Sequence, residues 1–141
     1  MTDADLVRKK LAFIETCVGD LRRFAEPARI EQDIREERFV EHTLQVAIQA
    51  ALDVASHIVS DDRLGEPEHN RALFELLARA GWVPAQLGPV LSDMVGFRNI
   101  LVNGYQAVDP AAVWDVVEYH LDDLLGYVAA IRARLGKAGD A

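Results

Sequence analysis

The sequence predicts an all-α protein, a bundle of four or five helices that run up and down in a single domain. Three observations support this class. Apolar residues recur at intervals of three and four, which is the spacing of a helix that buries one face. No segment of useful length alternates apolar and polar residues as a half-buried strand does. Every proline lies at the boundary of a predicted element, where helices tolerate it.

The length and composition fit one soluble domain. The chain has 141 residues, half of them apolar and 27% charged, which is ordinary for a single globular domain. We place this domain at residues 1–135 and expect residues 136–141 to form a mobile C-terminal tail. The start of the chain lacks the pattern of a signal peptide, and no stretch approaches the ~18 apolar residues of a membrane-spanning helix. A lone cysteine, Cys17, excludes an internal disulfide, so we expect a cytoplasmic protein.

Charge and metal-ligand patterns exclude several functions. The 15 Lys and Arg residues are outnumbered by 23 Asp and Glu residues, which gives a formal net charge of -8. The chain therefore has no general attraction for DNA or for an anionic membrane, and any binding of nucleic acid must depend on a local site. The sequence holds no Cys and His cluster at the spacing of a structural zinc site. We expect neither a metal nor a cofactor.

The first two predicted helices carry long apolar stripes. The first helix begins near Thr2, which can form a capping pair with Asp5, and is closed by Pro27. Its stripe consists of Val7, Leu11, Ile14, Val18, Leu21 and Ala25. The second helix extends from about Ile30 to Ser60. Its stripe consists of Val40, Leu44, Ala47, Ala51, Val54 and Ile58.

Start and stop signals define three further helices. A short helix at residues 70–80 ends at Gly81. The next begins near Pro89, because proline is tolerated in the first helical turn. Its apolar face holds Leu91, Met94 and Leu101. The last helix has the strongest start signal, Asp109 at the cap position followed by Pro110 at the first helical position. Its stripe holds Val113, Val117, Leu121, Leu124, Val128, Ile131 and Leu135.

A charged and a phenolic side chain interrupt the apolar face of the fourth predicted helix. Projected forward from Met94, that face includes Arg98, Leu101 and Tyr105. Because burial of an unpaired charge is costly, Arg98 must pair with a carboxylate, extend to water, or line a cleft or subunit interface that binds an anion. Asp53 on the second helix is a candidate to pair with Arg98 and orient it. A solvated or merely structural carboxylate fits the position of Asp53 equally well.

The sequence around Arg98 resembles a family motif. Residues 94–105 are Met-Val-Gly-Phe-Arg-Asn-Ile-Leu-Val-Asn-Gly-Tyr. This run is similar to the HepT-like toxins of the HEPN superfamily, also known as the DUF86 group. Their signature is an arginine followed by a polar residue, with a histidine five positions after the arginine and a tyrosine two positions further on. Arg98, Asn99 and Tyr105 match in type and spacing, and the resemblance extends over most of the chain, including residues 41–53.

Asn103 departs from the motif, because the family has histidine at this position. The chain's own histidines lie on other segments and cannot replace it by spacing. Asparagine can form hydrogen bonds to a phosphate but does not titrate, so it cannot move a proton near neutral pH as histidine does. Two explanations stay open. One, which we favour, is an engineered substitution that silences a toxic chain, and the other is a natural variant that has lost cleavage or keeps only binding.

The resemblance implies a function and a set of site residues. It implies the toxin of a toxin-antitoxin module, a homodimer that cleaves RNA without a metal, with Arg98, Asn99 and position 103 in a cleft between subunits. Asn103 would then leave this chain inactive or impaired. The resemblance also implies a partner antitoxin with a minimal nucleotidyltransferase (MNT) domain. This antitoxin would attach AMP to Tyr105 and so place negative charge beside Arg98.

Helix geometry agrees with a site shared between subunits. On an ideal helix, positions 98 and 103 lie about 140° apart, whereas positions 98 and 105 are nearly eclipsed. Either the helix loosens near Gly104, or the two residues meet their counterparts across a two-fold axis, which is the arrangement that the resemblance implies. We therefore predict a homodimer with the fourth helices near its two-fold axis. Two other functions remain alternatives. One is a non-catalytic HEPN module that binds a nucleotidyltransferase partner, and the other is a structural dimerisation domain in which Arg98 is sealed in an ion pair.

Overall fold

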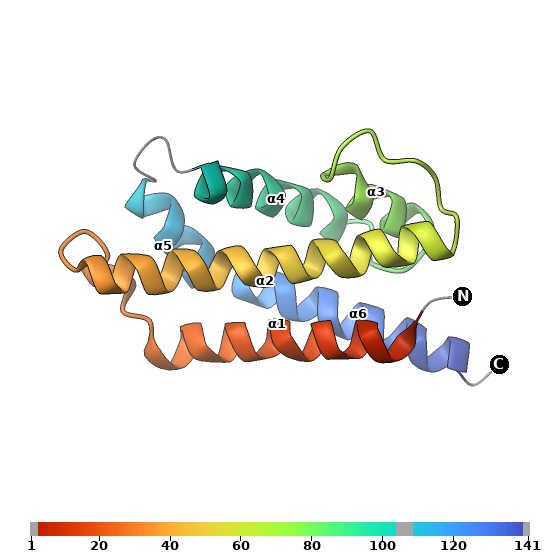
Figure 1. Cartoon of the computed structure of the whole chain (residues 1–141), viewed down its shortest axis with the longest axis horizontal. Helices are drawn as coiled ribbons and strands as arrows, with labels where there is room; N and C mark the ends of the chain where they lie inside the picture. The colour runs from red at the N-terminus through yellow and green to blue at the C-terminus, as the bar shows by residue number, and fades with distance from the viewer. Residues whose placement is uncertain (1–2, 104–108, 140–141) are drawn as a thin grey trace.

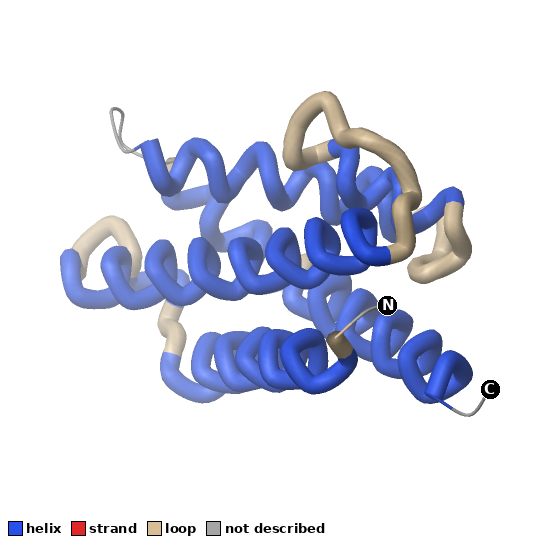
Figure 2. Tube along the Cα trace, turned by 45° about the vertical axis from the view of Figure 1, so that its right-hand side comes forward, coloured by secondary structure: helices blue, strands red, loops and turns tan. Residues whose placement is uncertain are grey.

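The computed structural model describes the backbone of residues 3–103 and 109–139, and the side chains of residues 3–102 and 109–136. Every regular element within these ranges is helical (Figure 2). The order is α1 (Ala4–Phe24), the short 3-10 helix η1 (Pro27–Arg29), α2 (Ile34–Asp61), α3 (Ala72–Arg79), α4 (Leu87–Asn103), α5 (Pro110–Tyr119) and α6 (Leu121–Gly139). The predicted all-α class is confirmed, with six α-helices in the described ranges in place of four or five.

Helix α2 is central to the bundle. It packs against α1 on one side and against α3 and α4 on the other, and α6 packs against both α1 and α4 (Figure 1). The four long helices alternate in direction along the chain, so the fold is up and down (Figure 1). The start of α1 and the end of α6 lie at the same end of the bundle. Since α2 lies between α1 and α4, it can connect side chains of those two helices.

The predicted apolar stripes form the core. All six stripe residues of α2 are at most 1% exposed. The largest fully buried side chain is Tyr127 of α6, which the stripes did not include. Its hydroxyl donates a hydrogen bond to the carbonyl oxygen of Ala51 at 2.9 Å, and its ring meets Phe74 edge to face, with 5.5 Å between ring centroids. Burial raises the pKa of the Tyr127 hydroxyl well above its usual range, so the group stays protonated and able to donate.

Two predicted helix ends are confirmed in atomic detail. The Asp109 carboxylate accepts a hydrogen bond from the Ala111 N–H at 2.9 Å and so caps α5. After α3, Gly81 has φ +81°, and the N–H of Trp82 donates back to the carbonyl of Leu77 at 2.9 Å. This is a Schellman C-cap, which needs the left-handed conformation that glycine adopts without strain.

The first helix begins one residue later than predicted and the second begins four residues later. The cap of α1 is Asp3, whose carboxylate accepts from the Leu6 N–H at 3.1 Å, and Thr2 lies outside the described residues. Helix α2 starts at Ile34 and not at Ile30. Asp33 determines this start, because its carboxylate accepts from the Arg35 N–H at 2.9 Å and aspartate is a preferred N-cap residue.

The last predicted helix is wrong as a single element, because it is divided at His120 into α5 and α6. The His120 imidazole lies 3.2 Å from a carboxylate oxygen of Asp115 and 2.9 Å from one of Asp123. These local contacts stabilise the break. The spacing of the apolar stripe is the same before and after His120, so the sequence pattern does not reveal the break. Helix α6 then continues to Gly139, into the segment expected to be a tail, and residues 140–141 lie outside the described ranges. None of the helices in the described part of the chain is long and apolar enough to cross a membrane.

Candidate functional site

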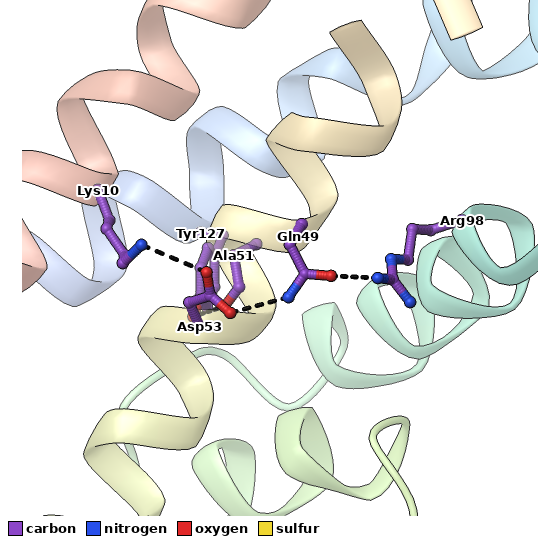
Figure 3. Close-up of polar contacts among 6 residues, drawn as sticks. All are labelled: Lys10, Gln49, Ala51, Asp53, Arg98 and Tyr127. Atoms are coloured by element: carbon purple, nitrogen blue, oxygen red, sulfur yellow. Dashed lines mark hydrogen bonds and ion pairs between the residues drawn. The ribbon is translucent and has the colours of Figure 1, made fainter. Parts of the chain in front are cut away.

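Arg98 is placed on α4 one turn after the buried Met94, and its half-buried side chain extends toward α2 (Figure 3). Its Nη2 donates a hydrogen bond to Oε1 of Gln49 on α2. Its Nη1 donates to Oδ1 of the adjacent Asn99 at 3.1 Å. The buried Nε has no hydrogen-bond partner in the structure as described. The guanidinium is thus held by two contacts at the boundary between core and solvent.

A chain of polar contacts continues from Gln49 across α2 to α1 (Figure 3). The Nε2 of Gln49 donates to Oδ1 of Asp53 at 2.8 Å, one turn further along α2. The Nζ of Lys10 on α1 donates to Oδ2 of the same carboxylate at 3.3 Å. Lys10, Asp53, Gln49 and Arg98 therefore form one continuous series, which we call the polar relay. It joins α1, α2 and α4.

Asp53 does not pair directly with Arg98, and this corrects the sequence-based expectation. Its carboxylate is occupied by Gln49 and Lys10, and it reaches Arg98 only through the amide of Gln49. The physical reason is the register of the two helices, which places position 49 and not position 53 opposite the guanidinium. Any orienting effect of Asp53 on Arg98 must pass through Gln49.

The charge of Arg98 is not neutralised by the residues that hold it. Both of its partners, Gln49 and Asn99, accept through neutral amide oxygens. No carboxylate of the described residues forms an ion pair with it. A half-buried guanidinium with neutral partners keeps its full attraction for an anion, and its planar fork matches phosphate oxygens.

The other predicted site residues are only partly placed. Asn99 lies beside Arg98 and contacts it. Asn103 is the last residue of α4, but its side chain lies outside the described part, as does all of Tyr105. The structure thus brings together two of the predicted residues and adds Gln49, which the sequence analysis missed. The available signal was the i, i+4 spacing of Gln49 and Asp53, a pair that forms hydrogen bonds on helices.

The end of α4 that follows Arg98 exposes apolar side chains. Ile100 is 58% exposed and Val102 is 44% exposed, and Phe97 is only partly buried. Val102 lies one turn after Arg98, whereas Ile100 lies about 160° from Val102 around the helix axis, so the two are exposed on different faces of α4. Across residues 3–103 and 109–139, no group of three or more His, Cys, Asp or Glu side chains is placed to hold a metal ion.

The fold is an up-and-down helical bundle, and its fourth helix carries the arginine motif. These two features define a HEPN-type domain. The chain belongs to the HepT-like ribonuclease family, because the family profile, described as "Ribonuclease HepT-like", matches residues 14–131. A relative named mRNA nuclease HepT, from Shewanella oneidensis, is 32% identical over 130 residues, which cover 92% of this chain and 98% of the relative. A tRNA nuclease HepT from Aphanizomenon flos-aquae is 25% identical over 132 residues, covering 92% of this chain and 90% of the relative.

Solved structures agree with this assignment. The structure of a tri-AMPylated HEPN toxin of Shewanella oneidensis in complex with an MNT antitoxin has a TM-score of 0.84 at 32% identity, and the match covers 94% of this chain and 99% of that one. A cytosolic Bacillus subtilis protein of unknown function, YutE, has a TM-score of 0.87 at 18% identity, with 97% and 93% coverage. The first supports a family of toxin nucleases that work with an antitoxin, and the second supports the fold alone.

Proposed function

We propose that this chain is the toxin of a HEPN/MNT toxin-antitoxin module, an endoribonuclease in which Arg98 binds the scissile phosphate. The observation that carries the proposal is the state of Arg98, a half-buried guanidinium held by the neutral amides of Gln49 and Asn99. A structural role would favour a sealed ion pair, which the described residues do not provide. Membership of the HepT-like family supplies the reaction class.

The proposed reaction needs two kinds of group. The 2′-hydroxyl of a ribose attacks the adjacent phosphorus, its proton goes to a base, and the 5′-oxygen of the next nucleotide leaves with a proton from an acid. Arg98 stabilises the extra negative charge on the phosphate in the transition state. The proton transfers require a group that titrates near neutral pH, and histidine is suited to them.

Asn103 lacks that titrating group, so we propose that the chain as it stands cleaves RNA weakly or not at all. Loss of a general acid or base costs ~10²–10⁴-fold in rate. The amide can still form a hydrogen bond to phosphate, and Arg98 retains its charge, so RNA binding persists. The proposed protein therefore binds the substrate of the family while lacking the group that would act as general acid or base.

We also propose a homodimer in which two copies of α4 approach each other. Val102, which is 44% exposed, lies one helical turn after Arg98 on the same face of α4 and would be covered by a second copy. Such an arrangement would bring Arg98 of one subunit near position 103 of the other, which is consistent with the angle of about 140° between these positions on one helix. RNA would bind across the two subunits, in the cytoplasm.

The proposed antitoxin is an MNT-domain nucleotidyltransferase that transfers AMP to Tyr105. Tyr105 lies seven residues after Arg98 in the sequence. In this transfer the tyrosine hydroxyl attacks the α-phosphorus of ATP, pyrophosphate leaves and the hydroxyl proton goes to a base. The AMPylated tyrosine, a phosphodiester, would carry negative charge and bulk near the arginine and compete with an RNA phosphate. The AMPylated state of the related Shewanella oneidensis toxin in its antitoxin complex supports this role.

The test is cleavage of total RNA, without added metal, by three proteins: the chain as it is, Asn103→His and Asn103→His with Arg98→Ala. We expect cleavage only by Asn103→His, at a rate ~10²–10⁴-fold above the starting chain. If none of the three cleaves RNA, the nuclease function is wrong for this chain. The alternative, a non-catalytic HEPN module that binds a nucleotidyltransferase, is favoured by Asn103 itself and would then be the better account.

A further inference from the structure

Gln49 is part of the polar relay but lies outside the family motif. It lies on α2, 49 residues before Arg98 in the sequence, and its amide contacts Arg98 on one side and Asp53 on the other (Figure 3). The next glutamine toward the N-terminus on the same helix, Gln45, has similar partial burial and forms no side-chain hydrogen bond within the described residues. The contact is therefore specific to position 49.

The orientation of the Gln49 amide is dictated by Asp53. A side-chain amide has one acceptor oxygen and one donor NH₂ group, whereas an ionised carboxylate can only accept. The NH₂ group of Gln49 must therefore face Asp53, and its oxygen must face Arg98. The reverse orientation would oppose two donors at Arg98 and two acceptors at Asp53. Lys10 in turn holds the second oxygen of Asp53 at 3.3 Å.

The neutrality of Gln49 has a consequence for anion binding. A carboxylate at position 49 would also fix the guanidinium, but it would neutralise its charge and repel a phosphate. The amide fixes Arg98 without either effect. Nη2 is bound to Gln49, Nη1 is bound to Asn99 and Nε is buried, and the second N–H of each terminal nitrogen has no partner among the described residues. These are donors that a phosphate could use.

We infer that Gln49, oriented by Asp53, is a positioning residue that presents the charged guanidinium of Arg98 to an RNA phosphate. This inference rests on the proposed function, because it assigns the phosphate of RNA as the ligand of Arg98. It adds a residue outside the arginine motif to the site and makes α1 and α2 part of the binding machinery. It also gives Asp53 and Lys10 a role that acts through Gln49.

The first experiment measures binding of a short RNA with a 2′-O-methyl group on every ribose, which the protein cannot cleave. We expect Gln49→Met to weaken binding about tenfold, because a hydrogen bond to the charged group is lost and Arg98 is no longer held. The matched control Gln45→Met should bind as the starting chain does. Arg98→Ala should show the largest loss. Thermal unfolding of each variant verifies that it is folded.

Gln49→Glu distinguishes presentation of the charge from simple anchoring. The new carboxylate would hold Arg98 firmly yet neutralise it, so we expect a loss of RNA affinity close to that of Arg98→Ala. If Arg98 needs only an acceptor for structural support, Gln49→Glu binds RNA at least as tightly as the starting chain. That result would overturn the inference.

A second measurement needs no RNA. Nuclear magnetic resonance can follow rotation of the Arg98 terminal nitrogens, which hydrogen bonds slow. We expect slow rotation in the starting chain and in Gln45→Met. Faster rotation is expected in Gln49→Met, and also in Asp53→Asn, since an amide at position 53 accepts either orientation of Gln49. Unchanged rotation in Gln49→Met would show that Gln49 does not position Arg98.

The two measurements separate failure of the inference from failure of the proposed function. If Arg98→Ala abolishes RNA binding while Gln49→Met and Gln49→Glu bind normally, RNA binds at Arg98 and the inference is wrong. If Arg98→Ala binds RNA as the starting chain does, the proposed function fails at its first step. In that case the inference about Gln49 is also wrong, because Arg98 would not bind phosphate. This holds even if Gln49→Met speeds rotation of the guanidinium.

Discussion

Two polar contacts on opposite faces of α2 have different physical characters. On one face, Tyr127 is fully buried and donates to the Ala51 carbonyl at 2.9 Å. On the other, Arg98 is half-buried, reaches Gln49 and leaves Nε without a partner in the described structure. Positions 49 and 51 lie about 160° apart around the helix axis. The Tyr127 hydroxyl has its hydrogen bond, whereas the Arg98 guanidinium keeps an unpaired charge and N–H donors without partners.

The difference shows how this fold separates stability from chemistry. A buried hydroxyl with one hydrogen bond and apolar neighbours contributes to stability, because its donor is satisfied and its ring fills the core. A guanidinium with an unpaired buried nitrogen and a free charge costs free energy in the folded state. Such a cost is typical of residues that are retained for a ligand. The predictions below change each region separately.

The largest expected effect on stability is at Tyr127. Tyr127→Ala removes a fully buried aromatic ring that contacts Phe74 and joins α6 to α2. We expect the free energy of unfolding to fall by ~3–5 kcal/mol, measured by denaturant titration. RNA affinity of the fraction that remains folded should be unchanged. A matching loss of affinity per folded molecule would show that the two faces of α2 are coupled.

A smaller effect is expected from the hydroxyl alone. Tyr127→Phe keeps the ring and removes only the donor to the Ala51 carbonyl. Because Ala51 lies within α2, its carbonyl can still accept from the helix backbone, so the loss should be ~1 kcal/mol. Denaturant titration of both Tyr127 variants separates ring packing from the hydrogen bond. A loss as large as that of Tyr127→Ala would mean that the hydroxyl and not the ring dominates this contact.

Much of the core side of this comparison could be predicted from the sequence. The α2 stripe from Val40 to Ile58 is buried as its spacing indicates, because periodicity reports directly which face of a helix avoids water. Asp109 and Gly81 determine helix ends through local backbone chemistry, which needs no knowledge of the fold. The same periodicity missed the break at His120, because the apolar stripe continues in phase across it.

The site was predicted less completely, for a physical reason. The apolar spacing of α4 showed that Arg98 lies on an inward-facing seam, and the motif supplied Asn99. Neither could show which residue of α2 faces the guanidinium. That depends on the relative register of two helices distant in sequence, and a shift of one turn exchanges Asp53 for Gln49. A carboxylate opposite Arg98 would form an ion pair with it, whereas the neutral Gln49 leaves the charge of Arg98 able to bind an anion.

Removal of the Arg98 charge should change stability very little. Arg98→Met deletes the unpaired buried Nε, which offsets the loss of the contacts to Gln49 and Asn99. We expect the free energy of unfolding to change by less than ~1 kcal/mol, while affinity for the methylated RNA falls sharply. Denaturant titration and RNA binding on the same samples test this. A loss of stability comparable to that of Tyr127→Ala would make Arg98 a structural residue.

The smallest effect should come from His120, which lies at the break between α5 and α6 and outside both regions. A hydrogen bond to Asp123, followed by the negative charge of Asp115, raises the pKa of the imidazole above its ordinary value. His120 and Asp93 of α4 both line a pocket of about 290 Å³. The charged imidazole therefore stabilises the folded state fully below about pH 6.5, and this contribution is lost as pH rises through the elevated pKa.

His120→Gln removes the charge and keeps a polar side chain at the break. We expect the melting temperature of this variant to fall below that of the starting chain at pH 5.5, and the gap to narrow at pH 9. The matched control is His42→Gln, at an exposed histidine with no side-chain partner in the described ranges, which should show little gap at either pH. A gap that widens with pH would mean that neutral His120 is the stabilising form. The carboxylates of Asp115 and Asp123 would then not be its main partners.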